Sequence, residues 1–157
     1  MTARLKLKLG GIFMWSWLKS GFLIFMAMNP LIMCAQEIEI TPEGHEIMSV
    51  FYAGGSYYLD QNQKVSLQDW LKAKNNLNEY EILVQSHTDN IGSMTYNQYL
   101  SQMRSESVLQ ALEEIMISRD DIRIQDFGEL APQFDNNQLQ GRLNNRRVDI
   151  ILVPPSS

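Results

Sequence analysis

The chain has 157 residues and a formal net charge of −5, a length that fits one domain with a short additional segment. The first 35 residues hold four of the 13 basic residues and no acidic residue, so the remainder has a net charge of −9. Such an acidic body argues against non-specific nucleic-acid binding and against docking on anionic lipid, both of which need a basic surface. Cys34 is the only cysteine, and the sequence has no cluster with metal-ligand spacing, so it predicts no intramolecular disulfide, no metal and no cofactor.

Residues 1–35 are typical of an export signal. Three basic residues near the start precede an almost wholly apolar run over residues 21–33, which is short for a membrane span. Cleavage after Ala35 is the favoured interpretation. Cleavage before Cys34, with lipidation of that cysteine, and an uncleaved membrane anchor are the alternatives. All three place the rest of the chain outside the cytoplasm, and a body without cysteine fits an oxidising compartment.

The first part of the body combines an acidic segment with a short apolar one. Residues 36–46 are expected to be a short lead-in, and residues 47–153 the domain, with a tail at 154–157. A first strand is predicted over residues 47–52. Residues 53–56 are predicted to form a loop, because paired glycines disfavour regular structure.

A helix is predicted to begin at Ser66. Ser66 resembles an N-cap, and Asp69 stands at the third helical position, as in a capping box. Apolar residues then follow at helical spacing: Leu67, Trp70, Leu71 and Leu77. The short apolar run within residues 81–85 predicts a buried strand.

The second half of the body repeats this alternation of strands and helices. A polar loop is expected over residues 86–93 and a long helix over residues 96–116. A strand containing Ile122, Ile124 and Phe127 follows, then a long polar loop over residues 128–146 and a last strand over residues 147–153. The apolar stripe of the long helix is predicted to comprise Leu100, Met103, Val108, Ala111, Leu112 and Ile115. Alternating helices and strands imply an α/β two-layer sandwich.

Polar residues gather where the second strand gives way to the long helix. Asp89 lies in the intervening turn, and Asn97, Ser101 and Arg104 follow at positions i, i+4 and i+7. This spacing predicts one polar face, separate from the apolar stripe. Such a face beside a strand end is a common position for a ligand in α/β proteins.

This segment resembles the OmpA-like family in residue identity and spacing. It matches the family pattern H-T-D-x-x-G-x-x-x-x-N-x-x-L-S-x-x-R through His87, Thr88, Asp89, Gly92, Asn97, Leu100, Ser101 and Arg104. Downstream, Phe127-Gly128-Glu129 with Pro132 is similar to the family's G-E-x-x-P, and Asn145-Arg146-Arg147-Val148 with Ile150 to its N-R-R-V-x-I. The resemblance covers roughly residues 47–153, and several motifs in the correct order make chance agreement improbable.

The resemblance implies a β-α-β-α-β fold with helices on one face of a mixed sheet, and non-covalent binding of peptidoglycan. The residues matching Asp89 and Arg104 hold the diaminopimelate of the stem peptide in the family. Asp89 would pair with its ammonium, and Arg104 would offer a bidentate fork to its carboxylate. The other expected ligand-binding residues are Thr88, Asn97, Ser101 and Arg146. The expected partners are the stem peptide and outer-membrane or other envelope proteins, in the periplasm or at the outer membrane.

Three positions depart from the family pattern. Ala53 stands where an aspartate is usual, Gly54 where an aromatic residue is usual, and Ser86 where a glycine usually precedes the histidine. Of Arg146 and Arg147, one is expected to point to the site and one to solvent.

Each of these site residues also has a structural interpretation. Asp89 is also a residue type that caps turns, and Arg104 has Glu106 and Glu113 near it in sequence. Asn97 serves equally well in a structural role, and His87 is interpreted as a structural residue beneath the loop.

Catalysis is not expected. Ser86, His87 and Asp89 are nearly adjacent, whereas the members of a hydrolase triad converge from separate segments. The alternative function is the wall-anchoring domain of a membrane-embedded, stator-like complex with an uncleaved N-terminal span. The mature N-terminus discriminates between these possibilities.

Overall fold

The computed structural model describes residues 38–41 and 44–155. Contacts divide the chain into two units, Met1–Leu31 and Ile32–Ser157, and the described residues all belong to the second. The predicted export segment and Cys34 lie outside the described residues.

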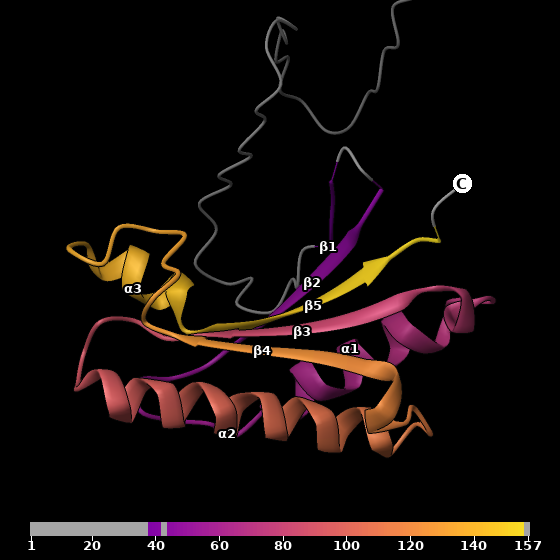
Figure 1. The fold of residues 1–157 in the computed structure, drawn as a ribbon, viewed down its shortest axis with the longest axis horizontal. Coiled ribbons are helices and arrows are strands. Elements are labelled where there is room, and N and C mark those ends of the chain that lie inside the picture. Colours follow the sequence, from indigo (N-terminus) through magenta and orange to yellow (C-terminus); the bar gives the residue numbers. More distant parts are fainter. Residues whose placement is uncertain (1–37, 42–43, 156–157) are drawn as a thin grey trace, which may run out of the picture. The chain divides into compact units, whose positions relative to one another are not determined.

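The domain is built on a five-stranded mixed sheet (Figure 1). Its strands are β1 (Ile38–Ile40), β2 (Glu46–Phe51), β3 (Glu81–His87), β4 (Ile122–Gly128) and β5 (Arg147–Val153), in the order β1-β2-β5-β3-β4. All neighbours are antiparallel except β3 and β4. The parallel pair needs a crossover connection, which the long helix between these two strands provides.

Two helices cover one face of this sheet, α1 (Gln61–Lys72) and α2 (Met94–Glu113), as Figure 1 shows. The shorter α3 (Leu139–Asn145) lies before β5, and two 3₁₀ turns are found at η1 (Leu77–Glu79) and η2 (Arg119–Asp121). The predicted α/β sandwich, with helices on one face of a mixed sheet, is confirmed. Among residues 38–41 and 44–155, no helix has the length and apolar character needed to cross a bilayer.

The core lies between the sheet and the two helices. Alternate residues of β5, namely Val148, Ile150 and Leu152, are fully buried and face the helices. The register sets Val148 opposite Val50 of β2 and Ile150 opposite Val84 of β3. Because side chains alternate across a strand, this register places the apolar set of each central strand on the same side.

The start of the first helix was predicted wrongly. The N-cap of α1 is Asp60, whose carboxylate accepts hydrogen bonds from the backbone N–H groups of Asn62 and Gln63. Ser66 lies inside the helix. Both residues are good N-caps by type, and the Asp60 cap prevails because it lets Gln63 bond both backbone groups of Phe51 on β2.

Three boundaries in the sheet and its loops also differ from prediction. Residues 38–40, within the expected lead-in, form β1 and extend the sheet beyond β2. Ser86 and His87 belong to β3 rather than to a loop. The segment predicted as a loop over residues 128–146 contains α3. Leu139 and Leu143 of this helix are exposed, so it has no buried apolar stripe from which the sequence could have predicted it.

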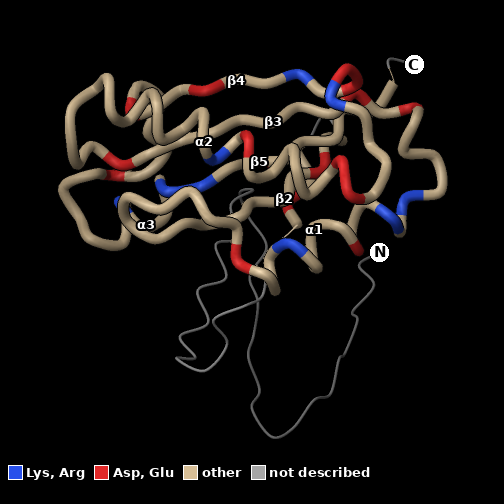
Figure 2. The backbone as a smooth tube through the Cα atoms, turned by 90° about the horizontal axis from the view of Figure 1, so that it is seen from below, with Lys and Arg blue, Asp and Glu red and all other residues tan. Residues whose placement is uncertain are grey.

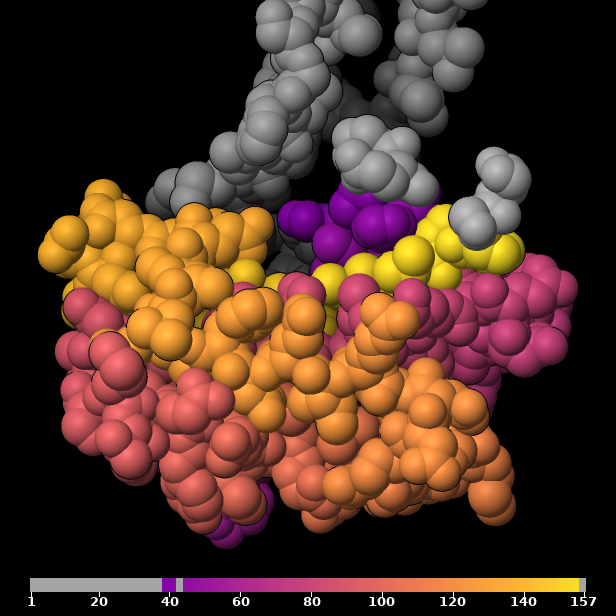
Figure 3. Space-filling model, viewed as in Figure 1, coloured from indigo at the N-terminus to yellow at the C-terminus, as the bar shows by residue number. Residues whose placement is uncertain are grey.

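Tertiary contacts hold α3 in place instead. The side chain of Asn145, fully buried, accepts hydrogen bonds from the backbone N–H groups of Gln133 and Phe134 and donates to the oxygen of Phe134. Gly141 packs so closely that a Cβ there would lie 1.9 Å from the carbonyl oxygen of Asp135. In Figure 3, the segment between β4 and β5 (light orange) forms the upper left of the visible face.

Candidate functional site

The sheet brings four chain segments together at one of its ends. Phe51, the last residue of β2, pairs with Arg147, the first of β5, and His87 at the end of β3 pairs with Gly128 at the end of β4. The segments that follow β2, β3 and β4, and Arg146 just before β5, therefore meet at this end. Four of the predicted site residues, Thr88, Asp89, Asn97 and Arg146, lie on or beside these segments.

Asp89 is buried and carries an ion pair. Its Oδ2 lies 2.7 Å from both Nε and Nη2 of Arg146. Its Oδ1 accepts a 3.3 Å hydrogen bond from the backbone N–H of Ile91. The turn-capping role considered for Asp89 is therefore present on Oδ1, while Oδ2 pairs with Arg146, a partner that the sequence did not predict.

Arg104 is almost completely buried, with 1% of its surface exposed. Its Nε donates to the carbonyl oxygen of Ser56 at 3.0 Å, Nη1 to that of His87 at 2.8 Å, and Nη2 to that of Ala53 at 3.3 Å. Because Arg104 links α2 to the loop after β2 and to the end of β3, it has a structural role in the domain.

The separate polar face predicted for the long helix is wrong. Arg104 stands four residues after Leu100 and four before Val108, and all three are buried on the side of α2 that faces the sheet. The buried residues of α2 are polar up to Ser105, apart from Leu100, and apolar from Val108 onward. Met103, predicted to lie in the core, is only partly buried. The suggested partners Glu106 and Glu113 bind Arg119 instead.

The pKa of Arg104 reflects both its burial and the charged or ionisable groups around it. Burial lowers the pKa of Arg104 to about 10, with Arg146 acting in the same direction, whereas Tyr52 and Asp89 raise it. The guanidinium is therefore still charged at neutral pH. It lies 5.0 Å from the centre of the Tyr52 ring, a favourable cation–π contact. Burial also raises the pKa of Tyr52 to about 12.

Asn97, Thr88 and Ser101 make internal hydrogen bonds. Thr88 Oγ1 donates to the carbonyl oxygen of Asp89, and Ser101 Oγ donates to that of Gln98. Asn97 Nδ2 donates to Glu129, while its buried Oδ1 has no partner among the described residues. Sequence reasoning assigned no role to Glu129, although the residue lies within a matched motif.

Arg147 does not point to solvent as predicted. Only 5% exposed, it donates from Nε to both carboxylate oxygens of Asp149 and from Nη2 to the side chain of Gln133. His87 lies against this pair, stacked on Phe127 with ring centres 5.1 Å apart. Burial lowers the pKa of His87, as does Arg147, and these effects outweigh that of Asp149.

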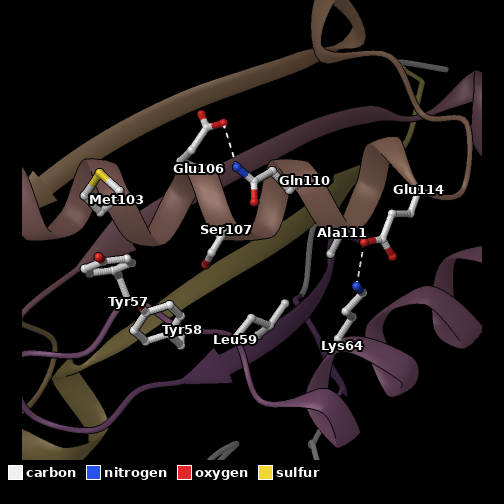
Figure 4. A pocket seen from close by; sticks show the side chains of 10 residues that line it. All are labelled: Tyr57, Tyr58, Leu59, Lys64, Met103, Glu106, Ser107, Gln110, Ala111 and Glu114. Atoms are coloured by element: carbon white, nitrogen blue, oxygen red, sulfur yellow. Dashed lines mark hydrogen bonds and ion pairs between the residues drawn. The ribbon is translucent and has the colours of Figure 1, made fainter.

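A separate cavity of about 270 Å³ lies between α2 and the segment that joins β2 to α1 (Figure 4). Tyr57 and Tyr58 line one side of it, and α2 lines the other. Its carboxylates already have partners, since Glu114 bonds Lys64 at 2.6 Å and Glu106 bonds Arg119 at 2.8 Å. It contains none of the predicted site residues, and we assign it no ligand.

The charged end of the sheet is therefore the candidate site. Figure 2 shows acidic and basic positions interspersed along the backbone. At this end of the sheet Asp89 and Arg104 are buried and Arg146 is largely buried. Within residues 38–41 and 44–155, no group of three or more potential ligands lies close enough to hold a metal ion.

Comparison with known proteins identifies the family. The model of the OmpA family matches residues 51–146. The chain belongs to the OmpA family. The match begins at the end of β2 and ends at Arg146, so it spans every residue of the candidate site.

Individual relatives agree with this assignment. The chain is 31% identical over 120 residues to the outer-membrane lipoprotein YfiB of Pseudomonas aeruginosa, covering 74% of this chain and 71% of that protein. It is similar to the crystal structure of the peptidoglycan-associated lipoprotein from Burkholderia pseudomallei, with a TM-score of 0.61 and 26% identity over 66% of this chain and 88% of that one. A MotB-like protein from Desulfovibrio vulgaris also matches, with a TM-score of 0.61 and 25% identity over 74% of this chain and 81% of that one.

Proposed function

We propose that this domain binds peptidoglycan non-covalently, through the diaminopimelate of the stem peptide, and so anchors the outer membrane or an envelope complex to the cell wall. The observation that carries the proposal is the meeting of one carboxylate and two guanidiniums, from Asp89, Arg104 and Arg146, at one end of the sheet. Peptidoglycan association is part of the name of one structural relative, and this supports the broader assignment.

The ligand chemistry fits these groups. The free end of diaminopimelate carries an ammonium and a carboxylate on one carbon. Asp89 Oδ1, which accepts only a long bond from the Ile91 N–H, is the position available to the ammonium. Arg104 has five N–H donors, of which three are used in the hydrogen bonds to backbone oxygens. The remaining donors and those of Arg146 are the partners proposed for the carboxylate.

The proposed location is the periplasm or the outer membrane. The relative from Pseudomonas aeruginosa is named as an outer-membrane lipoprotein, and residues 1–35 have the pattern of an export signal. A partner in the outer membrane or in another envelope complex is part of the same proposal. The function is binding and not catalysis, as the names of the relatives indicate.

The test is a titration of the protein with purified sacculi that contain diaminopimelate, at one salt concentration. Wild type should sediment with the sacculi, and soluble muropeptide should compete. Asp89→Asn removes the charge that balances the ligand's ammonium. Arg104→Lys keeps a charge but loses the planar fork. Each should cost most of the binding, about 2–5 kcal/mol for one member of a desolvated charged pair.

The control variant is Gln102→Ala, which alters an exposed residue of the same helix. It should bind as wild type does. Each variant is first checked for folding by circular dichroism, because Arg104 is also structural. Near-wild-type binding by folded Asp89→Asn and Arg104→Lys would rule out the clamp, and a wild-type protein that stays in the supernatant would refute peptidoglycan binding altogether.

The second candidate function is the wall-anchoring domain of a stator-like membrane complex, which the similarity to a MotB-like structure favours. It requires an uncleaved N-terminal span. Mass spectrometry of the protein purified from its native envelope distinguishes the cases. A start at Gln36 or a lipidated Cys34 contradicts the stator-like function, and a retained segment that includes Lys19 supports it.

A further inference from the structure

A hollow of about 430 Å³ lies beside the candidate site, between the first turns of α2 and the segment that follows β4. Three large apolar side chains contribute to its lining, Met94, Tyr99 and Leu130, and they are 59%, 54% and 65% exposed. The described lining is completed by three polar side chains, Thr95, Gln98 and Gln102. Single exposed apolar side chains are ordinary, but a group of them around one hollow of this size is typical of a binding surface.

Contacts at the candidate site hold the two walls of this hollow together. Glu129, next to Leu130, accepts a hydrogen bond from Nδ2 of the buried Asn97 on α2. The end of β4 approaches α2 so closely that a Cβ on Gly128 would lie 3.2 Å from the backbone nitrogen of Gln98. In Figure 3 the segment after β4 (light orange) lies above the start of α2 at the left of the visible face. The hollow is therefore continuous with the candidate site.

The hollow is nevertheless separate from the motif of the family. Each of its lining residues on α2 stands at an unspecified position of the pattern that begins at His87, and Leu130 stands at one in G-E-x-x-P. The charged residues that the proposed function assigns to diaminopimelate are not part of the described lining. The hollow is therefore a feature of this chain and not a second description of the diaminopimelate site.

The chemistry of the hollow also differs from that of the candidate site. None of the described residues that line it is charged. The exposed Tyr99 ring offers an apolar face and a hydroxyl, which suits a partner with both apolar and polar surface. A sugar ring of peptidoglycan has this character, because its C–H groups form an apolar face and its rim carries hydroxyl and acetamido groups. The sugar that carries the stem peptide is uncharged, since its carboxyl is in the amide bond to that peptide.

We propose that this hollow binds the glycan of peptidoglycan, and that the sugar carrying the bound stem peptide packs against Tyr99, between Met94 and Leu130. The inference rests on the proposed function, because the stem peptide brings that sugar to the hollow. Two residues, L-Ala and γ-D-Glu, separate diaminopimelate from the sugar and give a reach of about 10 Å. The lining residues of α2 all lie within about 8 Å of Asn97 along the helix axis, so the sugar can occupy the hollow while the peptide is held.

The test compares two ligands that differ only in the sugars. One is the disaccharide tripeptide GlcNAc-MurNAc-L-Ala-γ-D-Glu-meso-diaminopimelate, and the other is the N-acetylated tripeptide, in which L-Ala is likewise in an amide bond. Calorimetric titration of the whole protein gives the ratio of their dissociation constants. Wild type should bind the disaccharide form at least about threefold more tightly, the effect of one aromatic contact. Because the hollow carries no charge, raising the salt concentration should weaken both ligands and leave this ratio unchanged.

Two variants remove apolar surface from opposite walls of the hollow. Tyr99→Ala should bring the ratio close to one and leave the dissociation constant of the tripeptide unchanged. Leu130→Ala should lower the ratio by a smaller factor, and Tyr99→Phe, which keeps the ring, should retain most of it. The matched control is Gln102→Ala, which shortens a lining side chain without a ring; its ratio should equal that of wild type. Circular dichroism checks that each variant is folded.

The outcomes separate this inference from the proposed function. Wild type that binds both ligands equally, or folded Tyr99→Ala that keeps the wild-type ratio, would overturn the sugar contact and leave stem-peptide binding standing. A hollow that serves a partner protein in place of the glycan would give one of these two results. Tyr99→Ala that weakens both ligands by the same factor would also overturn the inference, because Tyr99 would then support the peptide site. Wild type that binds neither ligand would overturn both proposals.

Discussion

Replacing Arg104 by alanine should destabilise the folded domain even without ligand. The substitution removes the donors that satisfy the carbonyl oxygens of His87, Ser56 and Ala53. His87 is buried, so its oxygen is left without a partner, at a cost of about 1–3 kcal/mol. Ala53 is exposed and Ser56 partly so, and water replaces much of what their oxygens lose.

Two further contributions set the size of the effect. Loss of the contact with the Tyr52 ring, at 5.0 Å, costs about 0.5–2 kcal/mol. The substitution also removes the free-energy cost of burying a charged group, which favours the folded state; this cost is evident because burial lowers the pKa of Arg104. The expected net loss in the free energy of unfolding is about 2–4 kcal/mol, comparable to a typical truncation of a buried leucine such as Leu100.

Urea unfolding followed by circular dichroism measures this loss. The midpoint should fall by about 1–2 M with an unchanged slope, since small domains lose about 1–3 kcal/mol per molar urea. Gln102→Ala, on the exposed side of the same helix, should stay within about 0.5 kcal/mol of wild type. A loss below about 1 kcal/mol for Arg104→Ala would refute the structural role derived from its contacts.

Three other substitutions test the fold. Asp60→Ala should cost about 0.5–2 kcal/mol in unfolding free energy through loss of the α1 cap, and Ser66→Ala should be nearly neutral; the reverse order would restore the later helix start. Gly141→Ala should cost at least about 1–3 kcal/mol, measured by thermal melting, because its Cβ meets Asp135 at 1.9 Å; an unchanged melting temperature would contradict this close approach. Burial holds the pKa of His87 below its ordinary 6.5. As the pH falls, the unfolded chain therefore takes up a proton at this residue before the folded chain does. The stability that neutral His87 contributes is present above pH 6.5 and is lost as the pH falls through the folded pKa. His87→Gln should therefore flatten the fall in unfolding free energy between about pH 7 and 5, and an unchanged slope would exclude His87 as its cause.

The sequence by itself determined the order and type of the main elements. The predicted last strand coincides with β5, because its apolar residues are contiguous and buried on both faces. The spaced motif around Asp89 and Arg104 was enough to identify the family and to predict a candidate site at a strand end. These features are local in sequence, and local periodicity and residue identity report them directly.

The tertiary structure alone decided how the charged residues are used. Asn97, Ser101 and Arg104 could be assigned to one helical face by spacing, but spacing does not say whether that face meets water or the sheet. Arg104 is buried because carbonyl oxygens of the loop after β2 and of the end of β3 accept its hydrogen bonds, and no local pattern encodes those partners. The pairing of Arg146 with Asp89 joins residues 57 positions apart, and the same guanidinium lies against Gly54 in a third segment. Such contacts exist only once the sheet has brought its strand ends together, and they fix which charged groups lie at the candidate site.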